Sequence, residues 1–229
     1  MEKERTDLRF IQISDLHITS YRNLLEPMLD HINNEDVDFV VATGDIANDC
    51  TKEAIKLASK ALERIKHEVF VIPGEYDGGM FWVEEFGDRF KSVDMCNYHL
   101  EFLDTSFMGH KFASGWANLF MEDKEQRDWF NNRLELENYH IVFSHHPMLL
   151  NLSKNNFIRD NLRCVYSGHL HETFKLYFPY DCPQKHFKFG FNVVPLNFHG
   201  NSCYLVVSVK SNGDIINVPK IISEKKTAW

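Results

Sequence analysis

Apolar residues in the first third of the chain follow two alternating patterns. Short runs rich in β-branched residues at 8–13, 37–43 and 69–72 predict three buried strands. Two stretches between them, at 24–32 and 54–65, have apolar residues at helical spacing. A strand, helix, strand, helix, strand order predicts a parallel sheet with helices packed on it.

The rest of the chain has shorter and less regular elements. Helices are expected at 81–90 and 124–134, and strands at 97–104, 141–143 and 164–166. Three β segments follow, at 191–194, 203–209 and 214–219. Late antiparallel strands after an α/β start suggest a second sheet packed on the first. Because no linker or internal repeat separates these elements, we expect one domain over residues 1–229.

Composition supports a folded protein and makes nucleic acid a less favoured partner. The hydrophobic share is 44% with 19 Phe, which is enough apolar material for a core, so disorder is not expected as the main state. The net charge is −8, and the chain has no long run of Lys and Arg. Proteins that bind nucleic acid along its backbone usually have a clustered basic surface. Extended nucleic-acid binding is therefore not expected.

The sequence has no visible targeting signal. No apolar stretch precedes the first strand, and no run approaches the ~18 apolar residues of a membrane span. The five cysteines lie far apart without a C-x-x-C pair, which favours reduced thiols over a disulfide framework. A cytoplasmic protein without membrane contact is the expectation, and a homodimer is left open.

Five predicted strands end in short loops that carry metal-binding side chains. The loops are Ser14-Asp15-Leu16-His17, Gly44-Asp45-Ile46-Ala47-Asn48, Pro73-Gly74-Glu75-Tyr76-Asp77, Ser144-His145-His146-Pro147 and Ser167-Gly168-His169-Leu170-His171. A single Asp after a strand usually caps a helix, and a single His usually packs in the core or lies at the surface. Ligands of open α/β sheets gather at the carboxyl ends of strands. Five such loops in register with strand ends therefore favour a common site over five separate structural roles.

The mixture of carboxylates and imidazoles indicates which ions such a site would hold. Carboxylates bridge and neutralise divalent cations, and imidazoles favour manganese, iron, zinc or nickel over calcium. Two such ions about 3.5–4 Å apart can clamp a phosphate and generate a hydroxide nucleophile. The loops therefore predict a site for two divalent metal ions that binds a phosphate ester.

These loops resemble the motifs of the calcineurin-like metallophosphoesterase family. The family pattern is D-x-H, G-D, G-N-H-D/E, H-x-P or H-H-P, and G-H-x-H, and the likeness extends from about Phe10 to His171. The segments ISDLHIT, VATGDIAND, FLDTS, IVFSHHP and VYSGHLHE are most similar to the class III cyclic nucleotide phosphodiesterases. The resemblance implies a four-layer αββα sandwich of two mixed sheets flanked by helices.

The resemblance also implies a role for each loop residue. Asp15, His17 and His171 would hold the first ion, Asp45 would bridge the pair, and Glu75, His145 and His169 would hold the second. Asp45, Tyr76 and His146 are the candidate catalytic residues. His146 would lie beside the metal ligands, although the sequence leaves open which of the two neighbouring histidines points inward.

The family's Gly-Asn-His-Asp segment occurs here as Gly74-Glu75-Tyr76-Asp77. Glu75 keeps an oxygen ligand but adds a negative charge. Tyr76 replaces a histidine thought to contact the phosphate or protonate the leaving group, and a phenol with a pKa near ~10 is a poor proton donor at neutral pH. Two interpretations follow: an active phosphoesterase with weakened general-acid function, or a catalytically impaired metal-binding module with a regulatory or protein-binding role. A third is that both residues are engineered or local variants of an Asn-His pair.

The expected activity is hydrolysis of a phosphodiester or phosphomonoester, with a cyclic nucleotide as the favoured small substrate. The mechanism implied by the resemblance is in-line attack of a metal-activated hydroxide on phosphorus. Neither the physiological substrate nor the identity of the metals follows from the sequence.

Overall fold

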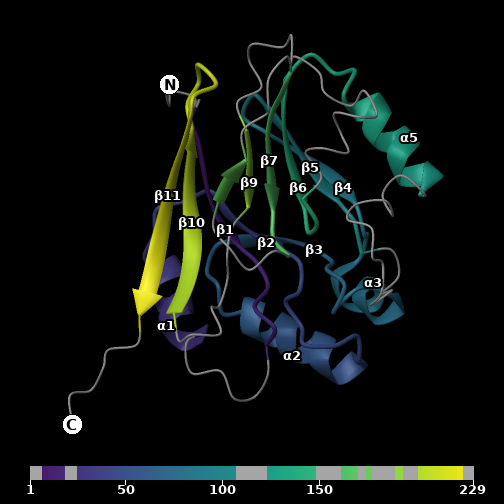
Figure 1. The fold of residues 1–229 in the computed structure, drawn as a ribbon, viewed down its shortest axis with the longest axis vertical. Coiled ribbons are helices and arrows are strands. Elements are labelled where there is room, and N and C mark those ends of the chain that lie inside the picture. The colour runs from purple at the N-terminus through teal and green to yellow at the C-terminus, as the bar shows by residue number, and fades with distance from the viewer. Residues whose placement is uncertain are drawn as a thin grey trace.

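The computed structural model describes residues 7–18, 25–106, 123–147, 161–169, 174–176, 189–192 and 201–223. In this part of the chain two mixed β-sheets stack face to face, with helices on their outer sides (Figure 1). The predicted α/β sandwich of two mixed sheets is therefore confirmed.

The first sheet has the strand order β11-β10-β1-β2-β3. Its strands are β1 (Leu8–Ile13), β2 (Phe39–Thr43), β3 (Glu68–Ile72), β10 (Asn201–Val209) and β11 (Ile215–Ser223). The three early strands run parallel, whereas β10 and β11 are antiparallel additions beside β1. β2 is buried along its whole length, which explains its uninterrupted apolar sequence.

The second sheet has the order β4-β5-β6-β7-β9-β8. Four central strands are parallel, and the two outer strands, β4 and β8, are antiparallel to their neighbours. The six strands are β4 (Lys91–Met95), β5 (Tyr98–Leu103), β6 (Tyr139–Ser144), β7 (Leu162–Ser167), β8 (Phe174–Leu176) and β9 (Phe189–Asn192).

The prediction that the late antiparallel strands form the second sheet is wrong. The late strands β10 and β11 extend the first sheet, and the second sheet is built from the middle of the chain. β10 pairs with β1, placing Val207 beside Phe10. Leu205 and Val207 face the space between the sheets, whereas Tyr204 and Val206 pack with the helices. Because β10 is apolar on both faces, it fits an interior position next to β1.

The segment before β5 also differs from the expectation. The helix expected at 81–90 is α3 (Met80–Phe86), which ends at Gly87 with a φ of 81°. A strand, β4, then forms a hairpin with β5. β4 is only partly buried, so its hydrophobic pattern is weak.

The remaining helices cover the outer faces of the sandwich. They are α1 (Leu25–Ile32), α2 (Lys52–Leu62) and α5 (Lys124–Arg133). The Thr51 side chain accepts a hydrogen bond from the Ala54 N–H and caps α2. α1 and α2 lie against the first sheet, and α5 lies beside the second (Figure 1). None of the helices among the described residues has the length and apolar character needed to cross a bilayer.

Aromatic side chains fill the space between the two sheets. Phe10 of β1 stacks on Phe39 with ring centroids 5.0 Å apart and meets Phe143 of β6 edge-on at 5.4 Å. Phe143 in turn stacks on Phe102 at 5.0 Å. All four rings are fully buried. Part of the unusually high Phe content is therefore used to join the sheets.

Candidate metal centre

Loops at the carboxyl ends of strands from both sheets meet at one rim of the sandwich. The Asp15 N–H donates to Gly44 O at 2.8 Å, and the His17 N–H donates to Asp45 O at 2.9 Å. In the second sheet, the Gly168 N–H donates to His145 O at 2.9 Å. These backbone bonds hold neighbouring loops in register, so the side chains they carry converge as expected.

Asp15, His17 and Asp45 form the first group of possible ligands. Their ligand atoms lie within 4.8 Å of one another, and all three residues are buried. The two carboxylates come from the loops after β1 and β2. His169, from the loop after β7, donates its backbone N–H to Asp15 Oδ1 at 2.9 Å. The second sheet thus contributes directly to the position of a first-sheet ligand.

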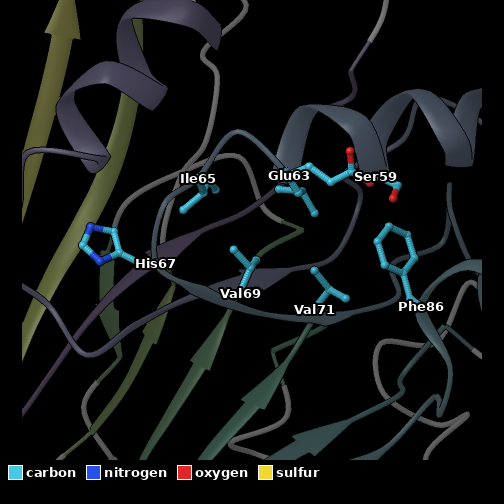
Figure 2. A pocket seen from close by; sticks show the side chains of 8 residues that line it. Ser59, Glu63, Ile65, His67, Val69, Val71 and Phe86 are labelled. Atoms are coloured by element: carbon cyan, nitrogen blue, oxygen red, sulfur yellow. The ribbon is translucent and has the colours of Figure 1, made fainter.

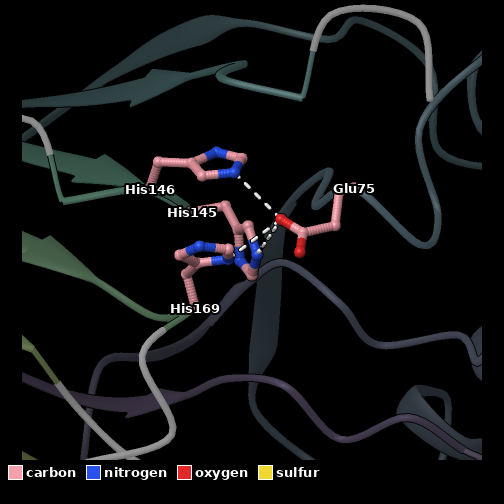
Figure 3. A group of neighbouring side chains, drawn as sticks. All are labelled: Glu75, His145, His146 and His169. Atoms are coloured by element: carbon pink, nitrogen blue, oxygen red, sulfur yellow. Dashed lines mark ion pairs between the residues drawn. The ribbon is translucent and has the colours of Figure 1, made fainter. Parts of the chain in front are cut away.

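Glu75, His145, His146 and His169 form the second group, again within 4.8 Å of one another. Figure 3 shows the three imidazoles converging on one carboxylate oxygen of Glu75. Glu75 Oε2 lies 2.9 Å from His146 Nε2, 2.9 Å from His169 Nδ1 and 3.4 Å from His145 Nε2. The structure therefore gathers both neighbouring histidines of the Ser-His-His-Pro segment around Glu75.

Asp45 lies between the two groups. Its Oδ2 is 3.8 Å from His17 Nε2 in the first group and 3.4 Å from His145 Nε2 in the second. Its Oδ1 accepts the Tyr76 N–H at 2.9 Å. One fixed carboxylate thus faces both groups, which is the geometry that a bridging ligand requires.

The ring of His145 is oriented by a backbone carbonyl. His145 Nδ1 lies 2.8 Å from Thr43 O, and a carbonyl can only accept, so Nδ1 carries the hydrogen. In the neutral ring, Nε2 would then present its lone pair to the site. This pattern of one donated N–H behind a free ring nitrogen is typical of histidine metal ligands.

The charges within the two groups shift the pKa values of their members. Burial alone would raise the pKa of Asp45, but the His145 imidazole beside it holds that pKa below its usual value. Burial likewise opposes ionisation of Glu75, yet the surrounding imidazoles hold its pKa well below its ordinary range. The pKa of His145 is lowered by burial but raised further by Asp45, and it lies well above its usual value. The carboxylates therefore remain ionised and attract positive charge.

Two buried atoms of the second group support a cation at this position. Glu75 Oε2 and His145 Nε2 are buried and have no hydrogen-bond partner among the described residues, because the short contacts between them lack hydrogen-bond geometry. Buried polar atoms are almost always satisfied by a partner or an ion. A carboxylate oxygen and an imidazole nitrogen are also the donor types that manganese, iron, zinc and nickel bind. The residues present therefore fit a divalent metal.

Glycine is required at three positions of the rim. A Cβ atom at Gly74 would lie 2.1 Å from Asp45 Oδ1, and one at Gly168 would lie 1.8 Å from Ser14 Oγ. Gly44 has a φ of 88°, a conformation that glycine adopts without the steric cost of a side chain. At Gly168, the close approach of the Ser14 side chain leaves no room for a Cβ atom.

Backbone strain is concentrated at the same rim. Among the described residues, five other than glycine have positive φ, and four of these are Asp15, His17, Asp45 and His169, at 50°, 41°, 52° and 72°. Such conformations cost roughly 1–3 kcal/mol each and persist where the surrounding structure enforces them. The strain therefore coincides with the candidate ligands.

We expect the Gly74→Ala variant to bind metal at least about tenfold more weakly, because the added methyl group displaces Asp45. Metal content and affinity would be measured by elemental analysis and calorimetric titration. Gly87→Ala is the control for backbone strain without a clash, since a Cβ there meets no atom within 4 Å, whereas its φ of 81°, unlike that of Gly74, is positive. Equal metal affinity in the two variants would contradict the steric explanation.

Two polar residues at the rim are not singled out by the sequence pattern. Buried Asp77 accepts the N–H groups of Gly74 and, at 2.6 Å, Ile46; burial and the charge of Asp45 raise its pKa to about 7. Thr105, after β5, contacts the ring of His146 through its hydroxyl at 3.0 Å. The only sequence signals for them are their places in the Gly-Glu-Tyr-Asp and Phe-Leu-Asp-Thr-Ser segments.

The predicted ligand His171 lies outside the described residues. Tyr76 lies beside the first group, with its ring edge-on to His17 at a centroid distance of 5.1 Å, and its side chain is partly exposed. The remaining predicted residues are in the two groups above.

A separate pocket lies between α2, β3 and α3 (Figure 2). Leu62, Val69, Val71 and Phe86 give it a mainly apolar lining. His67, on its rim, is hydrogen-bonded to the Ile32 carbonyl at 3.2 Å. Because this pocket lacks converging carboxylates and imidazoles, we place the chemistry at the rim of the sandwich.

The family model described as calcineurin-like phosphoesterase matches residues 8–173. The chain belongs to this family. A probable cyclic nucleotide phosphodiesterase of Coxiella burnetii is 24% identical over 195 residues, covering 74% of this chain and 78% of that protein. A probable glycerophosphodiester phosphodiesterase of Arcobacter nitrofigilis is 26% identical over 158 residues, covering 60% and 56%. The chain is thus a distant homologue of probable cyclic nucleotide phosphodiesterases.

Solved structures show the same fold at low sequence identity. A dimetal phosphatase from Danio rerio superposes with a TM-score of 0.70 at 12% identity, covering 94% of this chain and 98% of that one. GAP50 of Plasmodium, described as the anchor in the inner membrane complex, gives 0.59 at 14% identity, covering 98% and 87%. These similarities support the sandwich architecture of this chain.

Proposed function

We propose that this protein is a phosphoesterase that hydrolyses phosphodiesters with the help of two divalent metal ions. The observation that carries the proposal is the position of Asp45, whose Oδ2 faces both groups of possible ligands. Two adjacent groups joined by one carboxylate would hold two ions side by side, and a single structural ion would need only one group.

We assign one ligand set to each ion. Asp15, His17 and His171 would hold the first, Glu75, His145 and His169 the second, and Asp45 would bridge them. When bound, the pair would activate a water molecule and stabilise charge on the phosphoryl oxygens. The protein itself fixes the ligands: Thr43 O orients His145, and the His169 N–H orients Asp15.

The favoured substrate is a small phosphodiester, with a cyclic nucleotide first. The names of two relatives support this class, since both a cyclic nucleotide and a glycerophosphodiester contain a phosphodiester bond. Tyr76 would donate at most a hydrogen bond to the substrate, because a phenol is a weak acid at neutral pH. Esters with good leaving groups would then react fastest.

A metal-binding module that acts on a protein partner is the second candidate function. It is favoured by Glu75, whose extra charge opposes an anionic substrate, and by the loss of the family histidine at Tyr76. The retained set of carboxylates and imidazoles favours the enzyme.

The deciding experiment measures hydrolysis of bis-p-nitrophenyl phosphate by the metal-free protein while manganese is added. We expect turnover to rise with manganese and to saturate near two ions per chain. Excess chelator should reverse it. Binding of two ions without turnover, for this ester and for cyclic nucleotides, would contradict the enzyme and support the binding module.

A further inference from the structure

Two neighbouring histidines in the loop after β6 are held by different kinds of partner. His145 Nδ1 donates to the Thr43 carbonyl, which leaves the Nε2 lone pair for a metal ion. His146 Nδ1 instead lies 3.0 Å from the hydroxyl oxygen of Thr105. Because a hydroxyl can donate as well as accept, the two rings need not have the same tautomer.

The surroundings of Thr105 indicate which way its hydroxyl points. Thr105 Oγ1 already accepts the backbone N–H of His146 at 3.0 Å, and Thr105 is fully buried. A buried hydroxyl hydrogen needs an acceptor. Within the described part of the chain, His146 Nδ1 is the acceptor at hydrogen-bond distance. The Thr105 O–H therefore donates to Nδ1, and the His146 hydrogen lies on Nε2.

A ring nitrogen that carries a hydrogen has no lone pair for a metal ion. His146 Nε2 nevertheless faces the site, 2.9 Å from Glu75 Oε2. The ring packs against the proposed metal ligand His169 at a centroid distance of 4.4 Å. Its Nε2–H would thus be a donor within the second ligand group, available to a phosphoryl oxygen of a substrate bound there.

The segment that carries Thr105 is fixed by a network of buried polar groups. Gln126 accepts the Asp104 N–H at 2.7 Å and donates to Asp104 O at 2.8 Å, so its amide pairs with both polar groups of one residue. Arg89 pairs with the Asp104 carboxylate at 2.7 Å. Ser144 Oγ also donates to His146 O at 2.9 Å. The position of the His146 ring is therefore fixed both by the segment that carries Thr105 and by Ser144 at the end of β6.

We propose that His146 binds a phosphoryl oxygen of the substrate through its Nε2–H and does not hold a metal ion, with Thr105 as the positioning residue that selects this tautomer. The inference rests on the proposed function and names a substrate contact within it. It places a hydrogen-bond donor on the second-sheet side of the site, whereas the replaced family histidine corresponds to Tyr76 on the first-sheet side.

The tautomers can be measured without any variant. In the zinc-loaded protein, which is diamagnetic, ring nitrogen-15 chemical shifts distinguish a nitrogen that carries hydrogen from one bound to metal. We expect His145 to carry its hydrogen on Nδ1 and His146 on Nε2. Zinc bound to His146 Nε2, or a hydrogen on His146 Nδ1, would overturn the proposal.

The His146→Ala variant separates substrate binding from metal binding. It should retain two manganese ions per chain, while calorimetric titration with orthophosphate should show affinity weakened roughly 10- to 100-fold, as for loss of one hydrogen bond to a charged group. His145→Ala is the matched comparison and should lose a metal ion. Loss of an ion from His146→Ala, or unchanged orthophosphate affinity, would contradict the inference.

Variants of Thr105 test the positioning role. Thr105→Ser keeps the hydroxyl and should retain both the Nε2–H tautomer and orthophosphate affinity, whereas Thr105→Val should lose both at unchanged metal content. A valine variant with the wild-type tautomer would exclude this role.

These measurements need no turnover, so they remain informative if ester hydrolysis is absent. A two-metal protein that binds orthophosphate through His146 but hydrolyses nothing would refute the proposed function alone. A wild-type protein that binds no orthophosphate would refute the inference, whether or not esters are hydrolysed.

Discussion

The Asp45→Ala variant is expected to lose both the pairing of metal ions and phosphodiester hydrolysis. Asp45 is buried, faces His17 and His145 through one oxygen, and accepts the Tyr76 N–H through the other. Its removal leaves the two groups without a shared ligand. We expect turnover to fall by about 10³-fold or more, because the charge stabilisation supplied by bound metal is worth several kcal/mol.

Elemental analysis and manganese-dependent hydrolysis of bis-p-nitrophenyl phosphate would measure the two effects together. Asp36→Ala is the matched control, because Asp36 is an exposed aspartate that forms a 3.4 Å ion pair with Arg9 and belongs to neither ligand group. The control should behave as the wild type. An Asp45→Ala protein that holds two ions and keeps its activity would exclude the bridging role.

Tyr76→His should increase turnover by about 10²-fold, the lower part of the range for a general acid. The Tyr76 side chain is partly exposed and contacts His17 edge-on, so an imidazole can be accommodated there. An imidazole also has a pKa nearer neutrality than a phenol has. The gain should be larger for a phenyl ester than for a p-nitrophenyl ester, since the poorer leaving group depends more on protonation.

Rates for both esters would be compared in the wild type, Tyr76→His and Tyr76→Phe. The phenylalanine variant removes the hydroxyl alone and should change turnover much less than the histidine increases it. If Tyr76→His hydrolyses neither ester faster, the missing-acid explanation for this position is wrong.

The rim of the site was predictable because it follows from local sequence. Each of Asp15, Asp45 and His145 comes within two residues of a strand that is apolar enough to recognise, and parallel strands bring such positions to one edge. The mixed sheets and the candidate ligands could therefore be inferred from the order of elements and from the family resemblance.

Partners that are distant in sequence were not predictable in the same way. The sequence of β10 is compatible with a place in either sheet, because its two apolar faces do not show which strand lies beside it. Thr105 is separated from His146 by 41 positions, and its role depends on a hydroxyl contact that no local pattern encodes. Asp77 similarly gains its role from N–H groups of another loop.

The ligands of the proposed metal pair are divided between the two sheets. Asp15 and Asp45 follow strands of the first sheet, whereas His145 and His169 follow strands of the second, and the aromatic contact of Phe10 with Phe143 lies between these layers. The spacing of the ions is therefore a property of the interior as well as of the rim. Substitutions that change the volume of these rings would slide one set of ligands past the other, so metal preference could be redesigned from the core without altering any ligand.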